Sequence, residues 1–394
     1  MAPDATALPS PRPLRILVAA DVPNDRRGGM SRIQSFTGDA IAAAGHRVEY
    51  FCAEEAERAG ARGPLERFTF PLAVLRHARL RARTGEPFDI VNCHEPSAAA
   101  LALWRAHAGD PLLAVWSHGL ERRAWRLALE ERRLGRRGPS LRSRLANPAT
   151  RLWQADLALR RADHVFCMSG EDAAWLHDRL GARCPPITRL FPAAGPGFAA
   201  AAAARDYARM ERILFAGTWR KNKGIEDLVP ALARLLAARP ALTFTALGGG
   251  VAPGTVLDAF PRDVRPRVRC VTVDDDAATA REFAAHDLFV LPSLFEGTPL
   301  TLIEAMASGL PVVTTATCGM KDVVRDGENG LLVPLRDPAA IGAAVETLLG
   351  DAALRARLGS QARRVAAARY TWERVGGAML EAYLAMAAAR ARGA

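Results

Sequence analysis

Short apolar runs alternate with longer segments of helical spacing along most of the chain. The first apolar run covers residues 15–20, a helix-like segment at 31–44 ends at Gly45, and a second apolar run covers 47–52. Short apolar runs bounded by turn residues are typical of buried parallel strands, and glycine commonly follows the last turn of a helix. These segments predict a β-α-β unit, the building block of a doubly wound sheet.

The same alternation continues in two series. The first has predicted strands at 88–93, 112–117 and 162–168, and a helix at 171–180 with Ser169 as a suitable N-cap. The second has predicted strands at 212–216, 242–247, 268–273, 288–291 and 311–315, a helix at 225–238 and a last helix at 372–389. Such alternation predicts an α/β protein with parallel sheets, whose ligands bind at the carboxyl ends of the strands.

A break between the two series divides the chain. Residues 192–210 combine Pro and Gly with a run of Ala, which interrupts the alternation. We therefore expect a disordered tail at 1–13, a Rossmann-like domain at 14–195, a linker at 196–210, a second Rossmann-like domain at 211–371, and a helix at 372–394 that crosses back to the first domain. The two doubly wound domains would face each other across a cleft, which is the expected ligand site.

Composition and charge narrow the class of protein. The 394 residues are 49% apolar and 24% charged, as in ordinary globular proteins. The formal charge of +11 favours anionic partners such as phosphates, acidic lipid surfaces or nucleic acid, although an Arg surplus in an Ala-rich chain could equally reflect genome composition. The six cysteines are scattered without a Cys-x-x-Cys pair, which disfavours zinc and fits a reducing compartment.

Neither a secretory leader nor a spanning helix is apparent. The first residues lack a basic start with a long apolar core, and no run of about 18 apolar residues occurs. We therefore expect a cytoplasmic protein, which could lie at the inner face of the plasma membrane.

The segment 121–161 carries much of the positive charge. It holds twelve Arg and four acidic residues, interleaved with Leu and with Trp125 and Trp153. Basic helices with aromatic and Leu faces can lie on anionic membranes, and a solvated insertion with an Arg-rich surface explains the pattern equally well. Nucleic acid is not expected as a partner, because no recognition module is present.

The run from Leu291 to Val313 has the most specific pattern in the chain. It reads as a strand, a loop, a helix that ends at Gly309, and another strand. Pro299 suits the first helical turn, and the unpaired N–H groups of that helix end suit a diphosphate. Carboxylates accept hydrogen bonds from vicinal hydroxyls, so two acids here suit a sugar and a ribose. The predicted donor-binding residues are Glu296, Gly297, Thr298, Pro299, Leu300, Thr301 and Glu304. The simpler interpretation is a loop acid and a helix-surface acid, both facing solvent.

This run resembles the E-x7-E signature of retaining GT-B glycosyltransferases, family 4 (glycosyl transferases group 1). The resemblance implies a GT-B fold and transfer of a hexose-type sugar from a nucleoside-diphosphate sugar to a glycan or lipid-linked acceptor. It also implies that Glu296 contacts the donor sugar, that Glu304 contacts the ribose, and that no metal or other cofactor is needed. Polysaccharide biosynthesis is the corresponding family-level expectation.

Two further motifs in the first domain extend the resemblance. Gly28 and Gly29 match the family's Gly-Gly loop near the donor phosphates, and glycine lets a backbone approach an anion, although Gly-Gly is usually only a turn. His118, in Trp-Ser-His-Gly at a predicted strand end, resembles the strand-end His beside the transferred sugar. Its alternative is a histidine that satisfies a local loop, and His94 is open between the two interpretations.

A loop of the second domain is similar to the family's Gly-Arg…Lys-Gly loop, whose cations neutralise the diphosphate. Lys223 aligns with the Lys, whereas Thr218 stands at the Arg position. Arg220, two residues on, could supply the missing charge. The candidate catalytic residues are therefore Glu296, His118 and Lys223, with Thr218 and Arg220 as further donor-site positions.

Other features leave alternatives open. Residues 191–195 lack the family's usual Asn-Gly, and with Thr218 this favours a non-catalytic, membrane- or partner-binding descendant of the fold. A nucleotide-sugar epimerase is a second alternative, but no acid/base pair stands out for it. The run Asp274–Asp276 follows a strand and precedes a helix, so helix capping explains it better than a metal site does.

Overall fold

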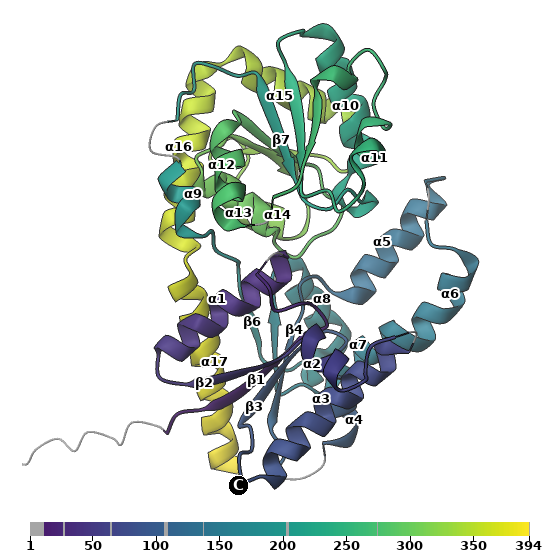
Figure 1. Cartoon of the computed structure of the whole chain (residues 1–394), viewed down its shortest axis with the longest axis vertical. Coiled ribbons are helices and arrows are strands. Elements are labelled where there is room, and N and C mark those ends of the chain that lie inside the picture. Colours follow the sequence, from purple (N-terminus) through teal and green to yellow (C-terminus); the bar gives the residue numbers. More distant parts are fainter. Residues whose placement is uncertain are drawn as a thin grey trace, which may run out of the picture.

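The chain folds into two α/β domains stacked one above the other (Figure 1). This computed structural model describes residues 12–26, 28–63, 65–105, 109–136, 138–201, 205–273 and 275–393. The tail expected at 1–13 lies almost entirely outside the described residues. Each domain is built on a six-stranded sheet whose strands pair in parallel, so the predicted α/β class with two doubly wound domains is confirmed.

The first sheet has the strand order β2-β1-β3-β4-β5-β6. Its strands are β1 (Arg15–Ala19), β2 (Arg47–Phe51), β3 (Ile90–His94), β4 (Leu112–Trp116), β5 (His164–Cys167) and β6 (Ile187–Arg189). Its helices are α1 (Gly29–Ala43), α2 (Ala53–Arg58), α3 (Glu66–Arg83), α4 (Ala99–Trp104), α5 (Glu121–Arg133), α6 (Leu141–Asn147), α7 (Trp153–Arg161) and α8 (Gly170–Leu180). Strands β3, β4 and β5 are buried along their whole length, which explains their continuous apolar runs.

The second sheet has the order β12-β11-β10-β7-β8-β9. Its strands are β7 (Arg212–Ala216), β8 (Thr243–Leu247), β9 (Val268–Val271), β10 (Leu288–Leu291), β11 (Val312–Thr315) and β12 (Leu331–Val333). Its helices are α9 (Pro196–Ala201), α10 (Ile225–Ala238), α11 (Pro253–Leu257), α12 (Asp276–Ala285), α13 (Leu300–Ala307), α14 (Cys318–Val323), α15 (Pro338–Gly350) and α16 (Ala352–Arg369).

The segment expected to be a linker is partly folded. Within residues 196–210 the structure places α9, whose Phe198 is buried edge-to-face against Phe283 of α12 with ring centroids 5.4 Å apart. Because α9 packs into the core of the second domain, the chain passes between the domains before this helix, near Phe191. The Pro and Gly residues of this segment are typical of a loop, so the sequence did not predict this short helix.

The last helix returns to the first domain, as expected. α17 (Trp372–Gly393) runs down along that domain in Figure 1. Trp372 stacks on Phe36 of α1 with centroids 5.0 Å apart, and the buried Tyr383 hydroxyl accepts a hydrogen bond from Asn92 Nδ2 at 2.6 Å. A Cβ atom at Gly376 would lie 2.4 Å from the Ala40 Cβ, so glycine permits this close helix contact.

The basic segment 121–161 forms α5, α6, a short π-helical turn and α7. In Figure 1, α5 and α6 stand out from the side of the molecule. The end of α5 also touches the second domain: Arg136 pairs with Asp227 at 2.9 Å, and Arg336 pairs with Glu131 at 2.6 Å. None of the described helices combines the length and the apolarity needed to cross a bilayer.

Candidate active site

A cleft of about 390 Å³ lies between the two domains. Its walls come from segments that follow strand ends: His118 after β4 and Met168 after β5 in the first domain, and Gly217 after β7 and Gly248 after β8 in the second. The loop between β10 and α13 and the start of α1 complete the walls. The cleft therefore sits where doubly wound sheets present their ligand sites.

Most residues predicted from the sequence line this cleft together. They are Gly28, Gly29, His118, Thr218, Lys223, Glu296, Thr298, Pro299, Leu300, Thr301 and Glu304. Gly297 is next to them in the domain contact, and Arg220 is exposed and does not line the cleft. The structure thus does not bring the suggested replacement cation, Arg220, to the site.

The loop before α13 joins the two domains through backbone contacts. The Gly297 amide donates to the His118 carbonyl at 3.1 Å, and the Thr298 hydroxyl donates to the Met168 carbonyl. A Cβ atom at Gly297 would lie only 2.5 Å from the His118 oxygen. Gly119, facing this contact, has a φ of +133°, which favours glycine. The two glycines therefore allow the domains to meet beside the cleft.

Glu296 pairs with the one lysine predicted at the site. Lys223 Nζ lies 2.7 Å from Glu296 Oε1, and both side chains are mostly buried. Lys223 ends a short 3-10 turn before α10, and its side chain packs against Gly217, whose φ of +142° turns the chain after β7. Because the two groups neutralise each other, neither charge is left unpaired at this mostly buried position.

Glu304 is tied to a residue that the sequence analysis missed. Arg32 of α1 donates from Nη2 to Glu304 Oε1 at 2.6 Å, and its Nε lies 2.9 Å from Asp276 Oδ1. The Glu304 side chain is fully buried, and this burial raises the pKa of its carboxyl despite the Arg32 charge. Arg32 follows Gly29 by three positions, which is about one helical turn. This spacing from the Gly-Gly loop could have identified Arg32 from the sequence.

Two polar atoms at the start of α13 have no partner of their own. Thr301 Oγ1 and Glu304 Oε2 are buried and lack a hydrogen bond within the described part of the chain. Buried polar atoms are nearly always satisfied in native proteins. Since both residues line the cleft, these atoms mark where a polar ligand would be held.

His118 and His94 form an aromatic pair beside the cleft. Their Nε2 atoms are 3.5 Å apart, and His118 also stacks on Trp116 with centroids 5.0 Å apart. Burial lowers the pKa of His118 to about 4, and burial together with His118 lowers the pKa of His94 well below its usual value. Both imidazoles are therefore neutral near pH 7 and act there as hydrogen-bonding groups, without positive charge.

The acidic run before α12 behaves as a helix cap. Asp275 accepts a hydrogen bond from the Ala278 amide at 2.6 Å, and Asp276 lies in the first turn. Asp274 is outside the described residues. No group of three or more His, Cys, Asp or Glu side chains in the described ranges has the arrangement of a metal site.

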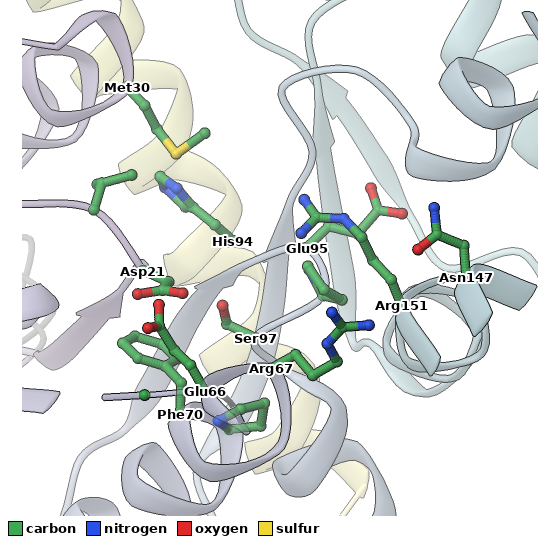
Figure 2. A pocket seen from close by; sticks show the side chains of 14 residues that line it. Asp21, Met30, Glu66, Arg67, Phe70, His94, Glu95, Ser97, Asn147 and Arg151 are labelled. Atoms are coloured by element: carbon green, nitrogen blue, oxygen red, sulfur yellow. The ribbon is translucent and has the colours of Figure 1, made fainter. Parts of the chain in front are cut away.

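A second cavity of about 540 Å³ lies in the first domain and shares Met30 with the cleft. Figure 2 shows Asp21 and Glu66 on one side of it, Arg151 and Asn147 on the opposite side, and Ser97 between them. The sequence analysis did not identify this cavity, because its residues come from five separate segments.

Comparison with protein families gives two matches. The description Glycosyltransferase Family 4 matches residues 27–191, and the description Glycosyl transferases group 1 matches residues 211–351. Each match falls within one of the two domains and contains that domain's side of the cleft.

Individual proteins agree with this result. A D-inositol 3-phosphate glycosyltransferase of Geodermatophilus obscurus is 33% identical over 259 residues, 61% of this chain and 56% of that protein, so the chain spans little more than half of this relative. A phosphatidyl-myo-inositol mannosyltransferase of Mycolicibacterium smegmatis is 27% identical over 325 residues, 82% of this chain and 77% of that protein. The solved sucrose-phosphate synthase of Thermosynechococcus elongatus has the same fold, with a TM-score of 0.74, 23% identity, and coverage of 95% and 100% of the two chains.

Proposed function

Since this chain belongs to the GT-B glycosyltransferases of family 4 and group 1, we propose that it transfers a hexose-type sugar from a nucleoside-diphosphate sugar to a glycan or lipid-linked acceptor, with retention of configuration. One observation supports this most directly. The Lys223–Glu296 pair, the buried Glu304 and the unpartnered Thr301 hydroxyl all line one cleft at the N-terminal end of α13.

The donor's parts fit this cleft in order. Free N–H groups at the start of α13 and the Lys223 ammonium suit the diphosphate. Glu304, with one oxygen unpartnered, suits the ribose hydroxyls, and Glu296 suits the hydroxyls of the sugar. Gly28 and Gly29 at the start of α1 offer a second helix end with no side chain in the way.

The proposed step breaks the bond between the anomeric carbon and the diphosphate oxygen. The electron pair of that bond goes to the diphosphate, where Lys223 and the α13 end stabilise the negative charge. The acceptor oxygen bonds to the anomeric carbon from the same face, and its proton passes to the leaving diphosphate. The neutral His118 lies beside this centre, where it would accept a hydrogen bond from the sugar or donate one to it. No metal is required for this step, since a cation and a helix end supply the electrostatic stabilisation.

A nucleotide-binding experiment tests the donor site. UDP, GDP and ADP, each with and without a sugar, are compared by thermal shift, since a ligand that binds the folded state raises its melting temperature. We expect one base to give the largest shift, and Lys223→Met to remove that shift. Lys221→Met is the matched control, because Lys221 pairs with Glu226 and does not line the cleft. Equal shifts in the two variants would contradict the site.

Activity separates the enzyme from a non-catalytic descendant, which Thr218 at the family's Arg position favours. Release of nucleoside diphosphate from the best donor is measured for wild type and for Glu296→Ala. We expect a loss of about 10²–10³-fold, as for removal of one group that stabilises a transition state. Equal release by the two proteins would favour the non-catalytic alternative.

We also propose that the α6 surface rests on an anionic membrane at the cytoplasmic side. Leu141 and Leu145 are 67% and 72% exposed, and they flank the exposed Arg142 and Arg144 on this helix. Apolar side chains interleaved with arginines are typical of helices that bind acidic lipid surfaces. Flotation with vesicles of phosphatidylglycerol tests this proposal: wild type should float at low salt, and Leu141→Ser with Leu145→Ser should not. Leu80→Ser, exposed on α3, is the control.

A further inference from the structure

The second cavity lies next to the reaction centre without belonging to the donor cleft. Met30 lines both spaces, and His94 on the cavity wall is 3.5 Å from His118 in the cleft. A molecule in this cavity could therefore place one of its atoms beside the donor sugar. The volume of about 540 Å³ is enough for a ring with several substituents.

Glu95 is the most unusual group in this cavity. Both of its carboxyl oxygens are buried, and although the Ser117 hydroxyl and the Glu121 backbone lie near the carboxyl, neither makes a hydrogen bond of good geometry with it. Burial, helped by the Glu121 charge, raises the pKa of Glu95 to about 8. A protonated carboxyl both donates and accepts hydrogen bonds, which matches the hydroxyl of a ligand. A buried carboxyl in a cavity that lacks a hydrogen bond of good geometry therefore points to a hydroxylated ligand.

The opposite wall adds a pair of carboxyl groups. Asp21 and Glu66 both contact Arg62, and burial together with Glu66 raises the pKa of Asp21 to about 6. Figure 2 shows the two carboxyl groups close together on this side, facing Ser97. Neighbouring carboxyl groups are good acceptors for the vicinal hydroxyls of a ring.

The positive charge of the cavity is concentrated at Arg67. Arg151 is neutralised by Glu121 at 2.7 Å, whereas no carboxylate of the described residues lies within ion-pair distance of Arg67, which only donates to the Thr150 hydroxyl at 3.3 Å. Asn147 lines the cavity beside Arg151 (Figure 2). An exposed guanidinium without a carboxylate partner, in a cavity that also offers an amide, is suited to a phosphate.

Resting on the transferase function above, we propose that this cavity binds the acceptor as a polyol that carries a phosphate group. The ring hydroxyls contact Glu95 and the Asp21–Glu66 pair, and the phosphate contacts Arg67 and Asn147. One free hydroxyl then faces His94 and His118 at the passage to the cleft. The phosphate thereby selects acceptors and sets which hydroxyl is presented to the donor.

The surroundings of Arg67 favour a lipid-linked source of this phosphate. Arg67 lies between Leu65 and Phe68, which are 63% and 40% exposed, and Asn147 follows the exposed Leu145 by two positions. A headgroup in the cavity with its phosphate at Arg67 would direct its chains towards these exposed apolar side chains. A soluble polyol phosphate has the same recognition chemistry, and the experiment distinguishes the two sources.

Binding without any nucleotide tests the cavity separately from the transferase proposal. Calorimetric titration of the full chain compares myo-inositol 1-phosphate, myo-inositol and inorganic phosphate. We expect the phosphorylated ring to bind at least about tenfold more tightly than either part, since a charge-assisted hydrogen bond contributes that much. Wild type that binds inositol as tightly as its phosphate would overturn the proposal.

Two variants with matched controls locate the contacts. Arg67→Gln should weaken inositol phosphate about tenfold while leaving inositol unchanged, and Arg76→Gln, exposed on the same helix outside the cavity, should bind like wild type. Glu95→Leu should weaken both inositol ligands, and the exposed Glu57→Gln should not. Wild-type affinity in Arg67→Gln or in Glu95→Leu would overturn the assignment of the phosphate or of the ring.

Vesicles and nucleotide complete the design. If wild type binds phosphatidylinositol in phosphatidylcholine vesicles and Arg67→Gln does not, the lipid-linked source is supported. If wild type binds free inositol phosphate but not these vesicles, a soluble acceptor is supported. The nucleoside-diphosphate thermal shift is measured in every variant. A nucleoside-diphosphate thermal shift as large as in wild type shows that the variant is folded. If wild type itself shows no such shift, the result counts against the proposed function and does not bear on the cavity.

Discussion

Arg32 and Glu304 stand 272 positions apart in the sequence, yet their side chains meet at 2.6 Å across the domain interface. The Arg32 side chain is 8% exposed and the Glu304 side chain is fully buried. The contact therefore joins α1 of the first domain to α13 of the second, at the wall of the proposed donor site. It makes the position of the carboxylate that we propose to bind the ribose dependent on how the two domains are placed.

Removing Arg32 should destabilise the protein strongly. Arg32→Ala leaves the buried Glu304 without its cation, and breaking a buried pair by removing one partner costs about 3–5 kcal/mol. The free energy of unfolding in urea measures this loss. The double variant Arg32→Ala with Glu304→Ala should lose less than the sum of the two single variants, because no buried charge remains.

An exposed pair provides the control for that cycle. Arg12 is 75% exposed in its ion pair with Asp89, so Arg12→Ala should cost less than about 1 kcal/mol. A loss of the same size in Arg32→Ala would show that the Arg32–Glu304 contact does not hold the domains together.

Gly297→Ala should separate the domains near the cleft. The new Cβ would lie 2.5 Å from the His118 oxygen, and such overpacking costs about 1–3 kcal/mol. The nucleoside-diphosphate thermal shift should fall with it, since Glu296 and Thr298 flank this residue. Gly342→Ala in α15 is the control: nothing lies within 4 Å of its Cβ, and it should stabilise by about 0.5–1 kcal/mol.

His118 should contribute to acid sensitivity. In the unfolded chain its imidazole takes up a proton near the ordinary value of 6.5, whereas in the folded protein its pKa is lowered to about 4. Its contribution to folding is therefore complete above pH 6.5 and is lost as the pH falls towards 4. Unfolding midpoints from pH 7 to 4.5 should fall less steeply in His118→Gln than in wild type. The exposed His177→Gln should follow wild type, and identical slopes in all three proteins would contradict the burial of His118.

Glu95 should make the folded protein less stable as the pH rises, which is opposite to the effect of His118. Its carboxyl ionises near 4.5 when unfolded and near 8 when folded, so its contribution to folding is complete below pH 4.5 and is lost as the pH rises through 8. Glu95→Gln does not titrate, and it should therefore be more stable than wild type at pH 8 relative to pH 5. Thermal unfolding at the two pH values measures this difference, and a constant difference between the proteins would rule out a protonated Glu95.

Local sequence patterns predicted the bounds of most of the expected strands and helices to within a residue or two. The helix predicted at 225–238 is α10 (Ile225–Ala238), and Ser169 caps α8 by accepting from the Asp172 amide. These elements follow from the spacing of apolar residues and from capping chemistry, which act over one or two turns. The short helix α9 escaped prediction because its stability comes from packing of Phe198 on α12, a contact absent from the local sequence.

The loop and helix from Glu296 to Glu304 were identifiable from the sequence, because a strand, a glycine-bearing loop and a helix start occur there in one continuous run. The same run does not indicate which residues face it in the folded protein. Arg32 and Lys223 reach these two acids from other segments, and only folding brings the charges together. Arg220, two residues after the expected position at Thr218, is exposed at the surface instead.

The sequence by itself determined the class of fold, the two-domain division and the loop and helix that we propose to bind the donor, since hydrophobic periodicity and turn residues are properties of neighbouring positions. Only the tertiary structure decided which carboxyl groups are buried, paired or left without partners. Burial and pairing depend on distances between segments, so Glu304 is held by Arg32, and Glu95 is a buried acid without a cation partner in a second cavity.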